Sequence, residues 1–257
     1  MICRLSARVA TRAWLAAFCL VALPVTADAG QVRISPLGLS LTPDHRAATL
    51  TLRNEAAAPV SLQVRVFSWQ QDVDAGMLLG PTMDVALSPA MITLAPGATQ
   101  LVRVLARKPA DSGERYYRLL VDELPSSASA SRDQIQVLTR YSLPLFLEPR
   151  VAGLPKLSLH LQQCQDGRQR LMVSNAGERR ARLADWHLRN GEQVLTGQPG
   201  LAGYVLPGSA LALPLPAGMV WPAQAARLEA KTDLGPWQAD VSPPSEPAAC
   251  QPPVAPN

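Results

Sequence analysis

The chain has 257 residues, of which 47% are hydrophobic and 17% are charged, and its formal net charge is +4. This composition favours a folded core over disorder, and the length suits one large or two modest domains. Because the basic residues form no cluster, nucleic acid is a poor candidate partner.

Residues 1–29 have the pattern of a secretory signal peptide. Arginines precede a short apolar segment at 13–25, and Ala27-Asp28-Ala29 fits the small-x-small rule for cleavage. We therefore expect cleavage after Ala29, with cleavage after Ala27 as the alternative. The apolar segment is shorter than the roughly 20 residues of a membrane span, and no later stretch reaches that length. The sequence predicts an exported protein without stable membrane insertion.

The region from 31 to 149 consists of short alternating segments separated by turns. Within each segment apolar and polar residues alternate, and the segments recur at spacings of roughly ten residues. No convincing helical period is present. This pattern is typical of an immunoglobulin-like β-sandwich. The alternation changes phase at Ser35-Pro36, which predicts a bulge or a strand that changes sheets. Residues 70–80 are polar and contain glycine, so we expect a loop there.

Residues 134–149 form the most regular of these segments. Pro144 indicates an edge strand, because proline cannot donate a hydrogen bond to a ladder. An apolar edge strand normally invites aggregation. This segment is therefore either a core strand or a strand that pairs with another protein. The side chains on its apolar side are Ile135, Val137, Thr139, Tyr141, Leu143 and Leu145.

A second β pattern follows a proline-bearing linker at 149–155. We predict an all-β protein with two domains, 30–149 and 150–241, and a loose proline-rich tail at 242–257. Two cysteines follow the predicted signal peptide, Cys164 and Cys250. In an oxidising compartment such a pair most simply forms a disulfide, with two free thiols as the alternative.

No residue pattern predicts catalysis, a cofactor or a metal site. The sequence contains no nucleophile elbow, phosphate loop or dinucleotide fingerprint. His45, His160 and His187 lack the spacing of metal ligands, as do the two distant cysteines. Asp122 and Glu123 are adjacent in a predicted strand, so they point to opposite faces and cannot share a proton.

Several motifs occur in a fixed order along the chain. Together they resemble the periplasmic chaperones of chaperone–usher pilus assembly, in particular the archaic branch. The first domain carries most of this resemblance, and the second domain contributes only Val173-Ser-Asn-Ala-Gly177. The motifs of the first domain are Leu52-Arg-Asn54, Arg65-Val-Phe-Ser-Trp-Gln70, Ser88-Pro89, Leu94-Ala-Pro-Gly97, Tyr116-Tyr-Arg-Leu-Leu-Val-Asp-Glu-Leu-Pro125 and Arg140-Tyr-Ser-Leu-Pro-Leu-Phe146.

The resemblance implies two immunoglobulin-like domains in a boomerang arrangement with a cleft between them. Such a chaperone donates the last strand of its first domain to an incomplete pilin and delivers the complex to an outer-membrane usher. On this alignment the donor strand is 134–146, and its side chains are Ile135, Val137, Thr139 and Tyr141. Thr139 is a departure, since a larger apolar residue is usual at this position.

The family anchors the C-terminus of the pilin with basic residues. Arg118 matches the basic position of the archaic branch, and Arg140 is the second candidate. The lysine that other members carry late in the donor strand is replaced by Pro144. The alternative role for Arg118 is that of a cross-strand partner for a carboxylate, which contributes little at a surface.

Two other classes of exported protein are compatible with the composition. A structural pilin or adhesin is also β-rich, but it would usually be a single incomplete domain with a free N-terminal extension. An enzyme or metal carrier on a sandwich scaffold would need a constellation of ligands that the sequence lacks. The sequence therefore favours a periplasmic chaperone whose partners are pilin subunits and an usher.

Overall fold

The computed structural model describes residues 32–72, 76–110, 112–125, 137–219 and 226–241. The predicted signal peptide, Ile135, Cys250 and the proline-rich tail lie outside these residues. The described residues form β-strands and turns and contain no helix, and none of them forms a helix able to cross a membrane. The prediction of an all-β protein with two immunoglobulin-like sandwiches is confirmed.

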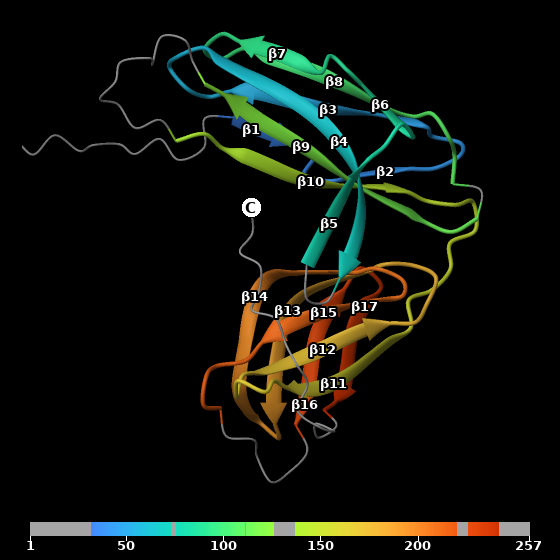
Figure 1. Ribbon diagram of the computed structural model, residues 1–257, viewed down its shortest axis with the longest axis vertical. Coiled ribbons are helices and arrows are strands. Elements are labelled where there is room, and N and C mark those ends of the chain that lie inside the picture. The colour runs from blue at the N-terminus through green and yellow to red at the C-terminus, as the bar shows by residue number, and fades with distance from the viewer. Residues whose placement is uncertain (1–31, 73–75, 111, 126–136, 220–225, 242–257) are drawn as a thin grey trace, which may run out of the picture.

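Two sheets build the first domain (Figure 1). One sheet has the order β1 (Val32–Ser35), β3 (Ala47–Asn54), β8 (Thr99–Ala106) and β6 (Val85–Ser88). The other has the order β2 (Leu39–Leu41), β10 (Arg140–Leu147), β9 (Arg115–Leu124), β4 (Val60–Asp72) and β5 (Gly76–Pro81), and β7 (Met91–Leu94) also pairs with β4.

The phase change at Ser35-Pro36 marks the point where the chain moves from one sheet to the other. β1 pairs with β3 in the first sheet, whereas β2 pairs with β10 in the second. The alternating apolar residues of both sheets meet in one core, which includes Leu52, Val104 and Leu119. Because the side chains of a strand alternate between its two faces, the remaining side chains of each strand face outward.

The loop expected at 70–80 is instead the end of a β-hairpin, so this prediction is wrong. β4 continues to Asp72, and β5 returns beside it with Trp69 opposite Leu79 and Gln71 opposite Met77. Gly76 has a φ of 72°, a conformation that glycine adopts without strain. Pairing between the strands holds polar residues in an extended conformation that local composition does not favour. The hairpin extends toward the second domain (Figure 1).

β10 is paired along its whole length on one side and along part of its length on the other. It pairs with β9 from Arg140 to Leu147, but the ladder with β2 covers only Leu145 to Leu147. Within the described residues, the first part of β10 therefore has strand β9 as its only ladder partner. Pro144 lies at the end of this open edge, where the missing N–H breaks no ladder with β2.

The second domain is a smaller sandwich. One sheet has the order β11 (Leu157–Gln163), β12 (Gln169–Asn175) and β15 (Ser209–Pro214). The other has the order β14 (Gln193–Val205), β13 (Ala181–Asn190), β16 (Arg227–Thr232) and β17 (Gly235–Asp240). Their inner faces bury a separate core around Trp186, Leu188 and Leu228.

Candidate functional site

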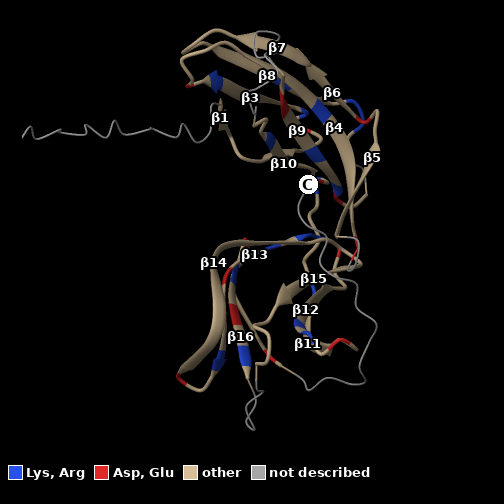
Figure 2. Ribbon diagram, turned by 60° about the vertical axis from the view of Figure 1, so that its left-hand side comes forward, with Lys and Arg blue, Asp and Glu red and all other residues tan. Residues whose placement is uncertain are grey.

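The outward face of the sheet formed by β10, β9, β4 and β5 carries the two predicted anchor residues, Arg118 and Arg140. Figure 2 shows Lys and Arg residues on β4, β9 and β10 of this sheet. Cross-strand pairing places Arg118 on β9 between Phe67 on β4 and Pro144 on β10. It also places Arg140 beside Asp122. Side chains that alternate with the core residues therefore gather on one surface.

An aromatic cluster joins this surface to the second domain. Trp69, Phe146 and Leu206 are buried together, with Tyr116 and Tyr204 packed against them. The Tyr204 ring lies 5.9 Å from Trp69 and 5.4 Å from Phe146, centroid to centroid. Because Tyr204 and Leu206 belong to the second domain, the cluster buries part of the outward face of the first.

A charged network lies beside the aromatic cluster. Arg180 of the second domain donates from Nη1 to Glu114 Oε1, and from Nη2 to Glu148 Oε1 at 2.9 Å. Its guanidinium carbon lies 3.5 Å from the centroid of the Phe146 ring. The side chains of Arg180 and Glu114 are 8% and 3% exposed. A buried cation of one domain is thus held between two carboxylates of the other.

Arg118 is a cation held against an aromatic ring. Its guanidinium carbon lies 3.9 Å from the centroid of the Trp69 ring, and its buried Nε atom has no hydrogen-bond partner. Burial lowers the pKa of the guanidinium to about 10, so it stays protonated at neutral pH. The alternative role expected for Arg118 is a cross-strand ion pair with a carboxylate. Arg118 forms no such ion pair with any described residue. A partly buried cation without an anion favours the binding of a carboxylate, which a planar guanidinium matches in shape.

Arg140, the second predicted anchor, already contacts a carboxylate. It donates from Nε to Asp122 Oδ1, while Arg65 Nη2 lies 2.6 Å from Asp122 Oδ2. Two guanidinium groups therefore share one carboxylate at the outer end of the surface. An anchoring role for Arg140 stays a prediction, and in this arrangement it would require Arg140 to bind a second anion or to leave Asp122.

The ion pairs of Asp122 should make stability depend on pH. Burial raises the pKa of Asp122, but the hydrogen bonds and charges of Arg140 and Arg65 outweigh burial and lower it overall. A lowered carboxyl pKa stabilises the fold above the unfolded value of about 4, and this contribution disappears as pH falls through the lowered value. We expect Asp122→Asn to reduce the free energy of unfolding at pH 7 by about 1–3 kcal/mol.

Denaturant titrations at pH 7 and pH 2 would measure this dependence. The difference between Asp122→Asn and the unsubstituted protein should shrink at the lower pH. Asp44→Asn is a matched control, because Asp44 pairs with Arg150 at an exposed position and such pairs contribute little. An equal difference at both pH values would contradict the assignment.

The predicted donor-strand residues differ in their surroundings. Val137 is 82% exposed, whereas Tyr141 is half-buried and packs against the core of the first domain. The backbone N–H of Thr139 donates to Glu123 Oε2 at 3.3 Å, and its carbonyl accepts from Glu123 N at 3.0 Å. Ile135 lies outside the described residues. Val137 and Thr139 thus lie just before β10, and their insertion into a subunit stays a prediction.

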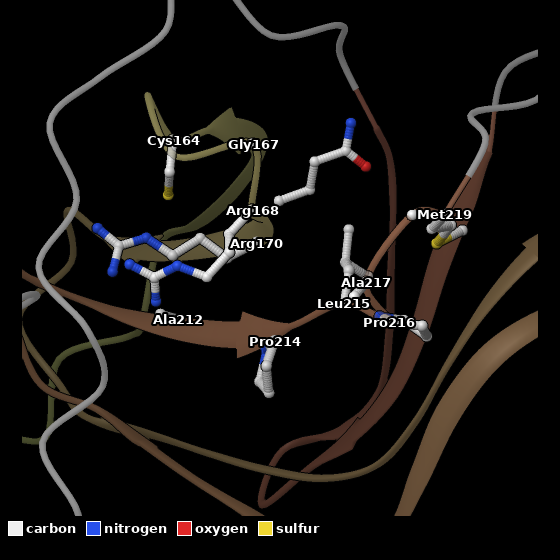
Figure 3. Close-up of a pocket in the computed structure, with 12 residues that line it drawn as sticks. Cys164, Gly167, Arg168, Arg170, Ala212, Pro214, Leu215, Pro216, Ala217 and Met219 are labelled. Atoms are coloured by element: carbon white, nitrogen blue, oxygen red, sulfur yellow. The ribbon is translucent and has the colours of Figure 1, made fainter.

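Cys164 is buried and disulfide-bonded. Its predicted partner, Cys250, lies outside the described residues, so this pairing stays a prediction. Cys164 lines a cavity of about 330 Å³ in the second domain together with Arg168, Arg170 and Met219 (Figure 3). The cavity lies among β12, β15 and their turns.

The sequence did not single out Trp69, Glu114 or Arg180 as site residues. Trp69 lies inside a motif that carried the family resemblance, but its contact with Arg118 depends on pairing between β4 and β9. Glu114 and Arg180 are 66 residues apart, and no local pattern connects them.

The fold and site define a two-domain β-sandwich protein with a partly buried cation on a sheet face next to an open strand edge. Residues 31–152 match the family model described as pili and flagellar-assembly chaperone, PapD N-terminal domain. The first domain is therefore similar to the N-terminal domain of pilus-assembly chaperones. None of the curated proteins compared with the chain matches it.

Solved structures share the fold over both domains. A chain of the CsuC–CsuE chaperone–tip adhesion subunit pre-assembly complex, from archaic chaperone–usher Csu pili of Acinetobacter baumannii, has a TM-score of 0.63 and 22% identity, covering 84% of this chain and 100% of that chain. The chaperone YadV has a TM-score of 0.57 and 16% identity, with 82% and 100% covered. The Escherichia coli chaperone DraB has a TM-score of 0.53 and 19% identity, with 82% and 97% covered.

Proposed function

We propose that the protein is a periplasmic chaperone that binds pilus or fimbrial subunits by donor-strand complementation and delivers them to an outer-membrane usher. The observation that carries this proposal is the position of Arg118. Its guanidinium lies on the same sheet as the open edge of β10, and it forms no ion pair with a described residue. A subunit strand added along β10 would bring its C-terminal carboxylate onto this sheet.

The open edge of β10 supplies the backbone part of such an interface. A strand with unpaired N–H and C=O groups pairs with an extended segment of another chain, and its alternating side chains fill pockets in that chain. Val137, which precedes β10, is an exposed apolar side chain available for such a pocket. The alternation in the sequence assigns Ile135 and Thr139 as well to the side chains that insert into the subunit.

The solved relatives support a chaperone over a structural pilin. In the Acinetobacter baumannii complex a chaperone is bound to a tip adhesion subunit. YadV and DraB are chaperones, and the chain covers 100% and 97% of their lengths. We place the protein in the periplasm because residues 1–29 have the pattern of a signal peptide. The same proposal includes membership of the archaic branch and delivery of the subunits to an outer-membrane usher.

Val137→Ser tests the donor strand. We expect the melting temperature of the isolated protein to change little, because Val137 is exposed in the free chain. Recovery of the chaperone–subunit complex from periplasm should fall, since burial of a valine contributes about 1.5–3 kcal/mol. Both quantities are measured on the same preparations.

Leu145→Ser is the matched control on the same strand. Leu145 is fully buried in the first-domain core, so its replacement should lower the melting temperature strongly. If Val137→Ser lowers the melting temperature as much as Leu145→Ser does, Val137 stabilises the chaperone itself and the donor-strand assignment is wrong.

A further inference from the structure

Gln71 on the β4–β5 hairpin forms three hydrogen bonds with the second domain. Gln71 donates from Nε2 to the carbonyl of Tyr204 at 2.8 Å and accepts at Oε1 from the backbone N–H of Leu206 at 3.0 Å. Its own carbonyl accepts from Ser209 Oγ at 3.2 Å. A single amide thereby satisfies the backbone of two second-domain residues, as a neighbouring strand would.

The two residues held by Gln71 are the ones that cover the aromatic cluster. Tyr204 packs on Trp69 and Phe146, and Leu206 is buried in the same cluster. Trp69 in turn supports the Arg118 guanidinium on its ring. A continuous series of contacts therefore runs from Gln71 through Tyr204 and Trp69 to Arg118.

We propose that Gln71 is a positioning residue that fixes the second domain over Trp69 and so keeps Arg118 buried and oriented for a carboxylate. This inference rests on the proposed function. An ion pair in a partly buried site is stronger than one in water, so the position of the covering domain affects how tightly an anion binds.

The chemistry of the amide distinguishes this contact from the apolar contacts of the aromatic cluster between the domains. Apolar side chains tolerate small displacements, whereas hydrogen bonds weaken steeply when their geometry changes. Glutamine supplies both the donor for Tyr204 and the acceptor for Leu206. Glutamate at this position retains the acceptor but has no donor, and its charge repels the Tyr204 carbonyl.

The first test measures the domain arrangement without a ligand. Nitroxide labels on Thr99→Cys and Gln238→Cys report the distance between exposed strands of the two domains. We expect Gln71→Ala and Gln71→Glu to broaden the distance distribution. Gln70→Ala is the control, because Gln70 is exposed and its side chain has no hydrogen bond among the described residues. An unchanged distribution in both Gln71 variants would overturn the inference.

The second test measures recognition of a carboxylate. The probe is a seven-residue peptide of alternating valine and threonine ending in phenylalanine, made with a free carboxylate and with a carboxamide. We expect the unsubstituted protein and Gln70→Ala to prefer the acid by about tenfold or more, as a desolvated charge pair does. For Gln71→Ala we expect this preference to fall to about threefold or less. A general loss of stability would weaken both peptides equally and leave the ratio unchanged.

The outcomes separate the inference from the proposed function. If the unsubstituted protein prefers the acid and Gln71→Ala keeps the full preference, the positioning role is wrong and the carboxylate anchor stands. If the unsubstituted protein shows no preference, the anchor is wrong and the inference fails with it.

Discussion

Replacement of Arg118 by glutamate should leave a folded monomer that no longer holds subunit. The substitution removes the cation that a C-terminal carboxylate would meet on the Trp69 ring and adds a repelling charge. Truncating one partner of a buried charge pair costs about 2–5 kcal/mol in binding. Co-purification from periplasm and isothermal titration with a purified subunit would measure the loss. Arg118→Lys should be intermediate, because an ammonium keeps the charge without the planar fork.

Arg118→Met separates binding from folding. Burial lowers the pKa of Arg118, so the charged side chain costs the free chaperone stability. We expect the methionine variant to melt at the same temperature or higher and still to lose subunit. Arg103→Glu is the control, because Arg103 is exposed on the other sheet. Normal recovery of subunit with Arg118→Glu would place the anchor elsewhere, and Arg140 would be tested next.

Replacement of Arg180 by leucine should destabilise the interface between the two domains. Glu114 and Glu148 would lose the cation between them, and Glu114 is nearly inaccessible to water. Removal of one partner of a buried ion pair costs roughly 3–5 kcal/mol. Arg179, whose Nε lies 4.0 Å from Glu114 Oε1, retains part of the compensation. Calorimetry should show a lower melting temperature or the separation of one transition into two.

Arg182→Leu is the control for this experiment, because Arg182 lies two residues further along and is exposed. It should melt close to the unsubstituted protein. Equal melting of Arg180→Leu and Arg182→Leu would show that the network does not hold the domains together.

The sequence by itself determined which side chains form the cores. Leu143 and Leu145 alternate with Ser142 and Pro144, and the former pair faces the core of the first domain. The phase change at Ser35-Pro36 likewise predicted the move between sheets. These predictions succeed because the period of two is a property of the local backbone and needs no information from the rest of the chain.

Only the tertiary structure decided which outward-facing side chains are also buried. Trp69, Arg118 and Phe146 face away from the first-domain core, but Tyr204 and Leu206 cover this surface from a distant part of the chain. The same contacts hold Gln71 in a strand where composition predicted a loop. Local pattern cannot reveal such burial, because it depends on contacts between residues far apart in the chain, such as those of Gln71 with Tyr204 and Leu206, 133 and 135 positions away.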